Sequence, residues 1–169
     1  MPAETVEAEA PLNLNELLHE VLSLSTKRLL SSGIVVDWEP ALVLPAITGR
    51  EQRVRGMFKQ LIDNAIDAMS VRGWRRRELR IATRQAQADL IEVIIEDSGP
   101  GIPESERLKV FEPFYTGKGA QGRRAGLGLT LVQDVVTEQR GIVTIGDAVG
   151  GGCRIELQFP LLTRQSNGT

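Results

Sequence analysis

The sequence has almost none of the residues from which covalent cross-links and zinc sites are built. Its 169 residues include one cysteine, Cys153, and one histidine, His19. A single cysteine excludes an intrachain disulfide and is typical of a reducing compartment, so we expect a cytoplasmic protein. One cysteine and one histidine also cannot supply the ligands of an ordinary structural zinc site.

A strong charge of one sign and long apolar runs are absent as well. The formal net charge of −2 argues against wholesale binding to a nucleic-acid backbone. No segment approaches the ~20 apolar residues of a transmembrane helix. The first residues, "MPAETVEAEAP", lack the apolar centre of a signal peptide. We therefore expect this chain to contact neither nucleic acid nor a membrane directly.

The sequence does contain enough apolar residues for one compact domain, because 41% of them are hydrophobic. The composition at the ends predicts a disordered leader over residues 1–11 and a disordered tail over residues 162–169. Residues 12–161 should form the domain.

Hydrophobic periodicity predicts helices that alternate with strands. "NLNELLHEVLSLSTKRLL" should be one helix, with Asn13 as its N-cap and Gly33 as its end. Thr48 and Glu51 have the spacing of a capping box, which predicts a long helix to about Met69. "GLTLVQDVVTEQ" should be a further helix. Strands are expected in "IVVDWE", "ELRIATRQ", "DLIEVIIED" and, as a hairpin, "IVTIGDAVGGGCRIELQF", with a short extended piece in "ALVLPAI".

This order of elements indicates a fold of the α/β (α+β) type, a two-layer sandwich. We expect a mixed, mostly antiparallel sheet of about five strands, with about three helices packed on one face.

The long helix carries two carboxamides where charged residues would be ordinary. In "MFKQLIDNAIDAMS", residues 57–70, the apolar positions follow the i, i+3, i+4, i+7 spacing of a buried face. Gln60 and Asn64 lie one turn apart at the edge of that face. Asp63 and Asp67 should lie on the solvated side of the helix.

Two glycine-rich segments could approach a ligand closely. In "EDSGPGI" a strand ends at Asp97 and a tight turn follows, which suits a flat ligand or is an ordinary strand-ending turn. "GKGAQGRRAGLGL" combines glycines and cations before a helix start, which suits a polyphosphate or is a solvated loop. Because Lys118 precedes Gly119, it is not a Walker A loop. "WRRR" at 74–77 could be a solvated turn or a docking patch.

The order and spacing of these segments, with "FEPFYT" and "GGG" in their places, resemble a known nucleotide-binding domain. That domain is shared by sensor histidine kinases, type II topoisomerases, the 90-kDa heat-shock chaperone and mismatch-repair ATPases, the GHKL superfamily with the Bergerat fold. The resemblance covers residues 12–161.

The resemblance implies that the chain binds ATP or ADP with Mg²⁺. Asn64 would coordinate the metal that bridges the phosphates, and Asp97 would accept a hydrogen bond from the adenine amino group. Phe111 and Phe114 would flank the lid, or serve only in packing. Cys153 stands where a small hydroxyl residue is usual. The remaining nucleotide contacts would come from Gly99, Gly101, Ile102, Thr116, Lys118, Arg123, Arg124, Gly126, Leu127, Gly128, Leu129 and Cys153.

Gln60 departs from the family pattern. The ATP-hydrolysing branches carry a glutamate there as general base, and an amide cannot accept that proton. Histidine kinases usually have asparagine at this position. Gln60 therefore makes a gyrase-like or chaperone-like ATPase improbable and leaves open whether phosphotransfer occurs.

Two functions remain. The first function is that of the catalytic domain of a two-component sensor histidine kinase. Because His19 lacks the residue pattern of a phosphoacceptor, the acceptor histidine would lie elsewhere. The domain would act with a phosphoacceptor-histidine hairpin domain and a response regulator. The alternative is an adenine-nucleotide sensor of the NifL type, a nitrogen-fixation regulator, which would control a transcription activator. We expect the isolated domain to be a monomer.

Overall fold

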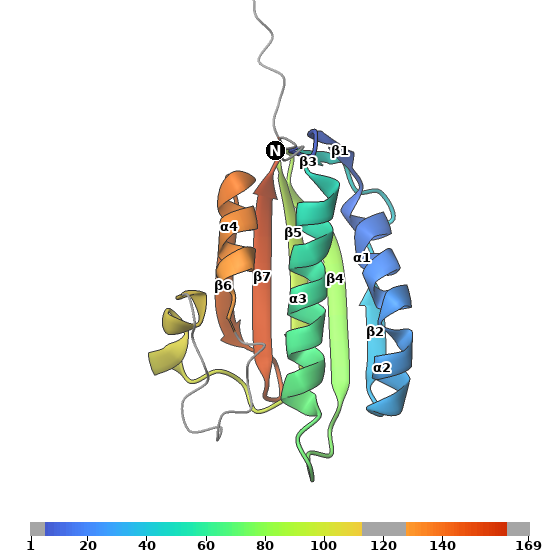
Figure 1. Ribbon diagram of the computed structural model, residues 1–169, viewed down its shortest axis with the longest axis vertical. Coiled ribbons are helices and arrows are strands. Elements are labelled where there is room, and N and C mark those ends of the chain that lie inside the picture. The colour runs from blue at the N-terminus through green and yellow to red at the C-terminus, as the bar shows by residue number, and fades with distance from the viewer. Residues whose placement is uncertain (1–5, 113–127, 162–169) are drawn as a thin grey trace, which may run out of the picture.

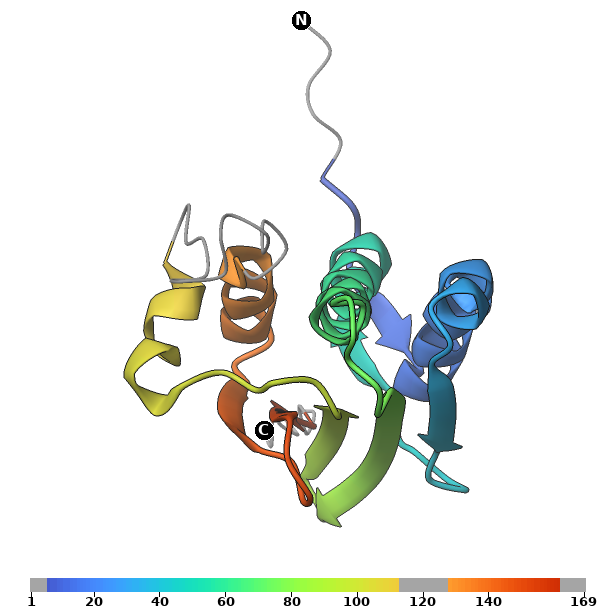
Figure 2. The ribbon, with the colours of Figure 1, turned by 90° about the horizontal axis from the view of Figure 1, so that it is seen from below.

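The structure is a computed structural model that describes residues 6–112 and 128–161, and these residues form two layers (Figure 1). Figure 2 shows the sheet as one layer and the helices together on one of its faces. The five strands have the order β2-β4-β5-β7-β6. Only β2 and β4 are parallel, and the other neighbours are antiparallel. The predicted fold class is confirmed.

The bounds of the main elements follow the hydrophobic periodicity. The strands of the sheet are β2 (Val35–Glu39), β4 (Glu78–Gln87), β5 (Leu90–Asp97), β6 (Ile142–Asp147) and β7 (Cys153–Pro160). The helices are α1 (Leu14–Leu24), α2 (Thr26–Ser31), α3 (Glu51–Met69) and α4 (Thr130–Glu138). Two short 3-10 helices are η1 (Glu104–Glu106) and η2 (Lys109–Phe111). Within these described segments, no helix has the length and apolarity needed to cross a membrane.

The core lies between the helices and the sheet. Along β7 the residues Cys153, Ile155, Leu157 and Phe159 are buried and alternate with partly exposed ones, as a strand with one covered face requires. The stripe predicted on α3 is buried against this face. The other face of the sheet is polar, and Glu96 there accepts bonds from Arg80 at 2.6 Å and Arg154 at 3.0 Å across neighbouring strands.

The first predicted helix is two helices. Asn13 is its N-cap as expected, because the side chain accepts a bond from the Glu16 amide at 3.3 Å. The helical path breaks at Ser25, which caps α1 and precedes α2. The Thr26 hydroxyl donates a hydrogen bond to the Leu22 carbonyl at 3.1 Å across this break.

The last two residues of the predicted disordered leader lie in a strand. Ala10 and Pro11 belong to strand β1 (Ala10–Leu12), which pairs antiparallel with β3 (Ile47–Gly49). We call residues 6–12 the N-terminal strap. The predicted tail, residues 162–169, lies outside the described residues.

The predicted capping box is also wrong, because Thr48 lies in a β-strand and is not the N-cap of α3. Thr48 pairs with Pro11 in the β1–β3 ladder, and Arg50 becomes the N-cap of α3 without a side-chain capping bond. The Glu7 carboxylate of the strap takes over this role and accepts from the Gln52 amide at 2.9 and 3.0 Å. A carboxylate at a helix N-terminus also interacts favourably with the helix dipole.

We expect Glu7→Ala to lower the free energy of unfolding by about 1 kcal/mol, because it leaves an N-terminal amide of α3 without its acceptor. Urea denaturation followed by circular dichroism measures this difference. Glu9→Ala is the matched control, since Glu9 is an exposed carboxylate of the same strap. Equal losses in the two variants would contradict the capping role of Glu7.

Candidate nucleotide-binding site

Asn64 lies at the edge of the buried face of α3. Phe58, Leu61 and Ile62 pack into the core, and this fixes the rotation of the helix about its axis. Asn64 is only 8% exposed. Neither polar atom of its side chain has a hydrogen-bond partner in the described part of the chain. A buried, unsatisfied amide costs about 1–3 kcal/mol, so this group is suited to a ligand that would satisfy it.

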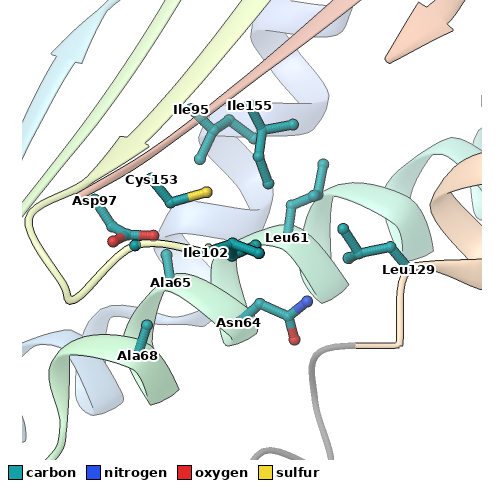
Figure 3. Close-up of a pocket in the computed structure, with 11 residues that line it drawn as sticks. Leu61, Asn64, Ala65, Ala68, Ile95, Asp97, Ile102, Leu129, Cys153 and Ile155 are labelled. Carbon is teal, nitrogen blue, oxygen red and sulfur yellow. The ribbon is translucent and has the colours of Figure 1, made fainter. Parts of the chain in front are cut away.

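Asp97 is the last residue of β5, a strand paired on both sides. It is opposite Leu79 of β4 and Cys153 of β7, so its backbone position is fixed by the centre of the sheet. The residue is 9% exposed, and Oδ1 accepts a bond from the Gly99 amide at 2.9 Å. Its side chain points to the helix-covered face, like Ile95 two residues earlier (Figure 3).

The two glycine turns, "DSGPGI" and "GGG", pack backbone against backbone next to Asp97. Gly152 has a φ of +118°, and a Cβ there would lie 1.9 Å from the Asp97 carbonyl oxygen. Gly101 has a φ of +79°, and its Cβ would lie 3.2 Å from the Gly152 carbonyl oxygen. Only glycine fits the first of these positions, so the "GGG" and "DSGPGI" segments are one packed unit.

A largely apolar pocket lies between α3 and the ends of β5 and β7. Figure 3 shows Asp97 at the end of β5 and Asn64 on α3, with Ala65 and Ile102 near them. The residues that line the pocket are Leu61, Asn64, Ala65, Ala68, Ile95, Asp97, Gly101, Ile102, Leu129, Cys153 and Ile155. Apolar walls with a few convergent polar groups are typical of a small-molecule site.

Gln60 holds the start of α4 against α3. Its Nε2 donates a hydrogen bond to the Gly128 carbonyl. The next residue, Leu129, donates its amide to the Val110 carbonyl at 2.8 Å and is the N-cap of α4, without a side-chain cap. The described segments on either side of residues 113–127 therefore meet at the start of α4. A helix start without a side-chain cap suits an anionic ligand.

The structure brings together six of the predicted nucleotide contacts in one pocket. These are Asn64, Asp97, Gly101, Ile102, Leu129 and Cys153. Gly99 lies beside them in the turn, where a Cβ would be 2.9 Å from Asp97 Oδ1. Gln60 and Gly128 bond to each other outside the pocket. Phe111 packs partly buried against the core. The residues Phe114, Thr116, Lys118, Arg123, Arg124, Gly126 and Leu127 lie outside the described residues.

The sequence did not indicate that the "WRRR" turn supports the site. Trp74 Nε1 donates to the Ser98 carbonyl at 2.9 Å, and Arg76 Nη1 donates to the Gly150 carbonyl at 3.2 Å. Arg77 donates to the Ser32 carbonyl at 2.7 Å. The bonds of Trp74 and Arg76 hold the two glycine turns, and the bond of Arg77 ties the "WRRR" turn to the end of α2. A tryptophan in an otherwise polar turn was the only sequence signal for this role.

Comparison with known proteins agrees with this geometry. The family model described as "Histidine kinase-, DNA gyrase B-, and HSP90-like ATPase" matches residues 49–163. The histidine-protein kinase/phosphatase MprB of Mycolicibacterium smegmatis is 34% identical over 121 residues, which are 70% of this chain and 22% of that protein. The histidine-protein kinase AtoS of Escherichia coli is 30% identical over 150 residues, 89% of this chain and 24% of that protein. This chain thus spans about a quarter of these relatives.

Solved structures show the same fold. The nucleotide-free catalytic domain of histidine kinase ThkA superposes with a TM-score of 0.78 at 27% identity, covering 90% of this chain and 95% of that one. Full-length ShkA in complex with AMPPNP gives 0.76 at 25% identity, covering 94% and 32%. The chain therefore belongs to the family of histidine kinase-, DNA gyrase B- and HSP90-like ATPases, and its fold is that of histidine kinase catalytic domains.

Proposed function

We propose that this chain is the nucleotide-binding catalytic domain of a sensor histidine kinase, which binds Mg-ATP for transfer of the γ-phosphate to a histidine on a separate helical domain. The observation that carries the proposal is that the Asp97 carboxylate and the Asn64 carboxamide line the same apolar pocket, and that both polar atoms of Asn64 lack a partner among the described residues. The match to histidine kinase catalytic domains supports it. A response regulator is the expected partner, and ThkA has been solved with one.

Asp97 suits adenine and rejects guanine. The adenine amino group would donate to the Asp97 carboxylate, an acceptor in a site that is largely shielded from water. Guanine carries a carbonyl oxygen at that position, which a carboxylate would repel. Ile95, Ile102 and Ile155 supply apolar contacts for the base, and the small side chains of Ala65 and Ala68 leave room beside it.

Asn64 suits the metal that accompanies the triphosphate. Mg²⁺ prefers oxygen ligands and keeps several of its waters, so the Asn64 carbonyl could bind it directly and the amide nitrogen could bond a phosphate oxygen. A bound Mg²⁺ would neutralise part of the phosphate charge. The residues present therefore fit the metal, because both polar atoms of the Asn64 side chain lack a partner in the described residues.

Gln60 in this proposal positions the start of α4 and does not activate water. Its amide is bonded to the Gly128 carbonyl and has no basic group to accept a proton. A histidine acceptor needs no such base, because a neutral imidazole nitrogen attacks with its own lone pair. Gln60 is thus compatible with transfer to histidine and incompatible with the family's hydrolytic mechanism.

We expect Asn64→Ala to abolish the strengthening of nucleotide binding by Mg²⁺ and to leave the free energy of unfolding unchanged or raised. The substitution removes the proposed metal ligand together with two buried atoms that have no partner among the described residues. Titration calorimetry with and without Mg²⁺ measures the first effect, and urea denaturation measures the second.

Asn15→Ala is the matched control for Asn64→Ala. Asn15 donates to the Ala41 carbonyl at 3.0 Å and accepts from the Thr83 hydroxyl at 2.6 Å, so its loss should lower stability and leave the Mg²⁺ dependence intact. If Mg²⁺ strengthens binding to Asn64→Ala as much as to the unchanged protein, the metal ligand is another residue.

The second candidate is an adenine-nucleotide sensor of the NifL type that controls a transcription activator. It is favoured by Gln60, which stands where kinases usually have asparagine and is occupied by its bond to Gly128.

Titration calorimetry with ADP and a non-hydrolysable ATP analogue, each with and without Mg²⁺, separates the two functions. Metal-dependent binding of the analogue at least as tight as ADP supports the kinase. Markedly tighter ADP binding supports the sensor. Either function suits a cytoplasmic, monomeric domain.

A further inference from the structure

A shallow polar groove on the exposed face of α3 shares Asn64 with the apolar pocket. Gln60, Asp63, Asn64 and Asp67 follow the i, i+3, i+4, i+7 spacing and therefore share one face of the helix. They line the groove together with Arg28, Gly56 and Lys59. Asn64 lines both the groove and the apolar pocket. A ligand with its base beside Asp97 would thus pass Asn64 and extend into this groove.

Arg28 reaches into the groove from α2, which lies beside the second half of α3 (Figures 1 and 2). Its Nη1 bonds Asp63 Oδ1 and its Nη2 bonds Asp67 Oδ1, both at 2.9 Å. The sequence predicted that these two carboxylates are merely solvated, and the structure shows that they hold Arg28. The Arg28 side chain remains 50% exposed, so the guanidinium can take a further acceptor.

We propose that Arg28 binds the terminal (γ) phosphate of ATP, and that Asp63 and Asp67 position the Arg28 guanidinium for this contact. This inference rests on the proposed function, because it assumes a nucleotide in the Asp97 pocket. Asn64 lies between that pocket and Arg28, so the phosphate farthest from the base comes nearest to the guanidinium. The planar guanidinium matches the geometry of a phosphate and remains charged at any physiological pH.

The charges of the groove support this role. Asp63 and Asp67 stand on either side of Asn64 in the sequence, and without Arg28 both would repel a triphosphate. Lys59 is the other cation of the groove, bonded to Asp63 at 2.8 Å. At 100° per residue it projects about 140° away from Asn64 around the helix axis, whereas Asp67 projects about 60° away. The cation held by Asp67 is therefore better placed for a phosphate bound at Asn64.

The test compares the binding of ADP and of a non-hydrolysable ATP analogue, both with Mg²⁺, to variants of this chain by titration calorimetry. Arg28→Ala should weaken the analogue about tenfold, the loss expected for one charged hydrogen bond. ADP should weaken by less than about threefold, because it lacks the terminal phosphate. Retained ADP binding also shows that the variant is folded.

Arg55→Ala is the matched control. Arg55 also bridges a carboxylate of the N-terminal helices to one of α3, bonding Glu20 at 3.2 Å and Glu51 at 3.0 Å, but it lies outside the groove. It should leave both affinities unchanged. Equal weakening of ADP and the analogue by Arg28→Ala, or no weakening, would overturn the inference. Failure of the unchanged protein to bind any adenine nucleotide would instead refute the proposed function.

A triple variant separates contact from charge compensation. In Arg28→Ala with Asp63→Asn and Asp67→Asn, the carboxylates no longer repel the phosphates. If Arg28 contacts the terminal phosphate, the analogue should remain about tenfold weaker than in the unchanged protein. Full recovery of its affinity would show that Arg28 only neutralises the two carboxylates, and the proposed contact would be wrong.

Discussion

Gly152→Ala should lower the free energy of unfolding by about 3 kcal/mol or more, the largest stability loss that we expect from one added methyl group in this protein. The new Cβ would lie 1.9 Å from the Asp97 carbonyl oxygen and 3.0 Å from the Ser98 Cα. Both neighbours are backbone atoms at the end of β5, where Asp97 is paired in the sheet and the Ser98 amide donates to the Glu78 carbonyl at 3.1 Å, so neither can move aside cheaply. Urea denaturation monitored by circular dichroism measures the loss.

Gly151→Ala separates steric overlap from backbone strain. Gly151 has a φ of +102°, but a Cβ there would have no atom of the described residues within 4 Å. Its substitution should cost only the strain of an unfavourable φ, about 1–2 kcal/mol. Equal losses in the Gly151 and Gly152 variants would show that the close approach to Asp97 is unimportant.

Asp97→Asn should weaken binding of ADP and of an ATP analogue by at least about tenfold, because it removes a charge-assisted acceptor for the adenine amino group. The fold should persist, since the asparagine carbonyl can still accept from the Gly99 amide, now at 2.9 Å from Asp97 Oδ1. The variant should also discriminate less between adenine and guanine nucleotides. Titration calorimetry with both kinds of nucleotide measures these changes.

Glu96→Gln is the control for Asp97→Asn, because it makes the same chemical change one residue earlier on the opposite face of the sheet. It should weaken the bonds to Arg80 and Arg154 and leave nucleotide affinity unchanged. An unaltered dissociation constant in Asp97→Asn would remove the adenine assignment. A loss of affinity in both variants would indicate a general disturbance of β5.

The fold was predictable where the signal is local and repeated. The alternation of buried residues from Cys153 to Phe159 identifies β7 and its covered face. The apolar stripe of α3 likewise determines which side of that helix meets the sheet. Asn13 was predictable as a cap because its partner, Glu16, is three residues away.

The errors arose where partners are distant in the sequence. Thr48 and Glu51 have correct spacing for a capping box, but the pairing of Thr48 with Pro11 prevents it. The acceptor that replaces it, Glu7, is 45 residues from Gln52. The sequence of the strap has no periodicity that predicts the Thr48–Pro11 pairing or the Glu7–Gln52 bond. Two short strands stabilise each other only when the rest of the fold brings them together.

The site divides in the same way. That Asn64 and Asp97 line one pocket was predictable, because each lies within a family motif with helical or turn geometry around it. Arg28 and Trp74 belong to no motif and reach the site only through tertiary contacts, with Asp63 and Asp67 in the first case and with Ser98 in the second. Sequence reasoning therefore identified the groups expected to bind the ligand and missed those that surround and support them.

The bonds between Glu7 and the first turn of α3 would couple nucleotide binding to the attachment of the strap if binding displaces α3. The helix that carries Asn64 begins where the strap is attached, and 19 hydrogen-bonded residues transmit an axial displacement as a nearly rigid rod. If nucleotide binding moved α3 along its axis relative to the strap, it would lengthen or shorten the Glu7–Gln52 bonds. Linkage is reciprocal, so a pull on the strap would then change nucleotide affinity by the same coupling free energy.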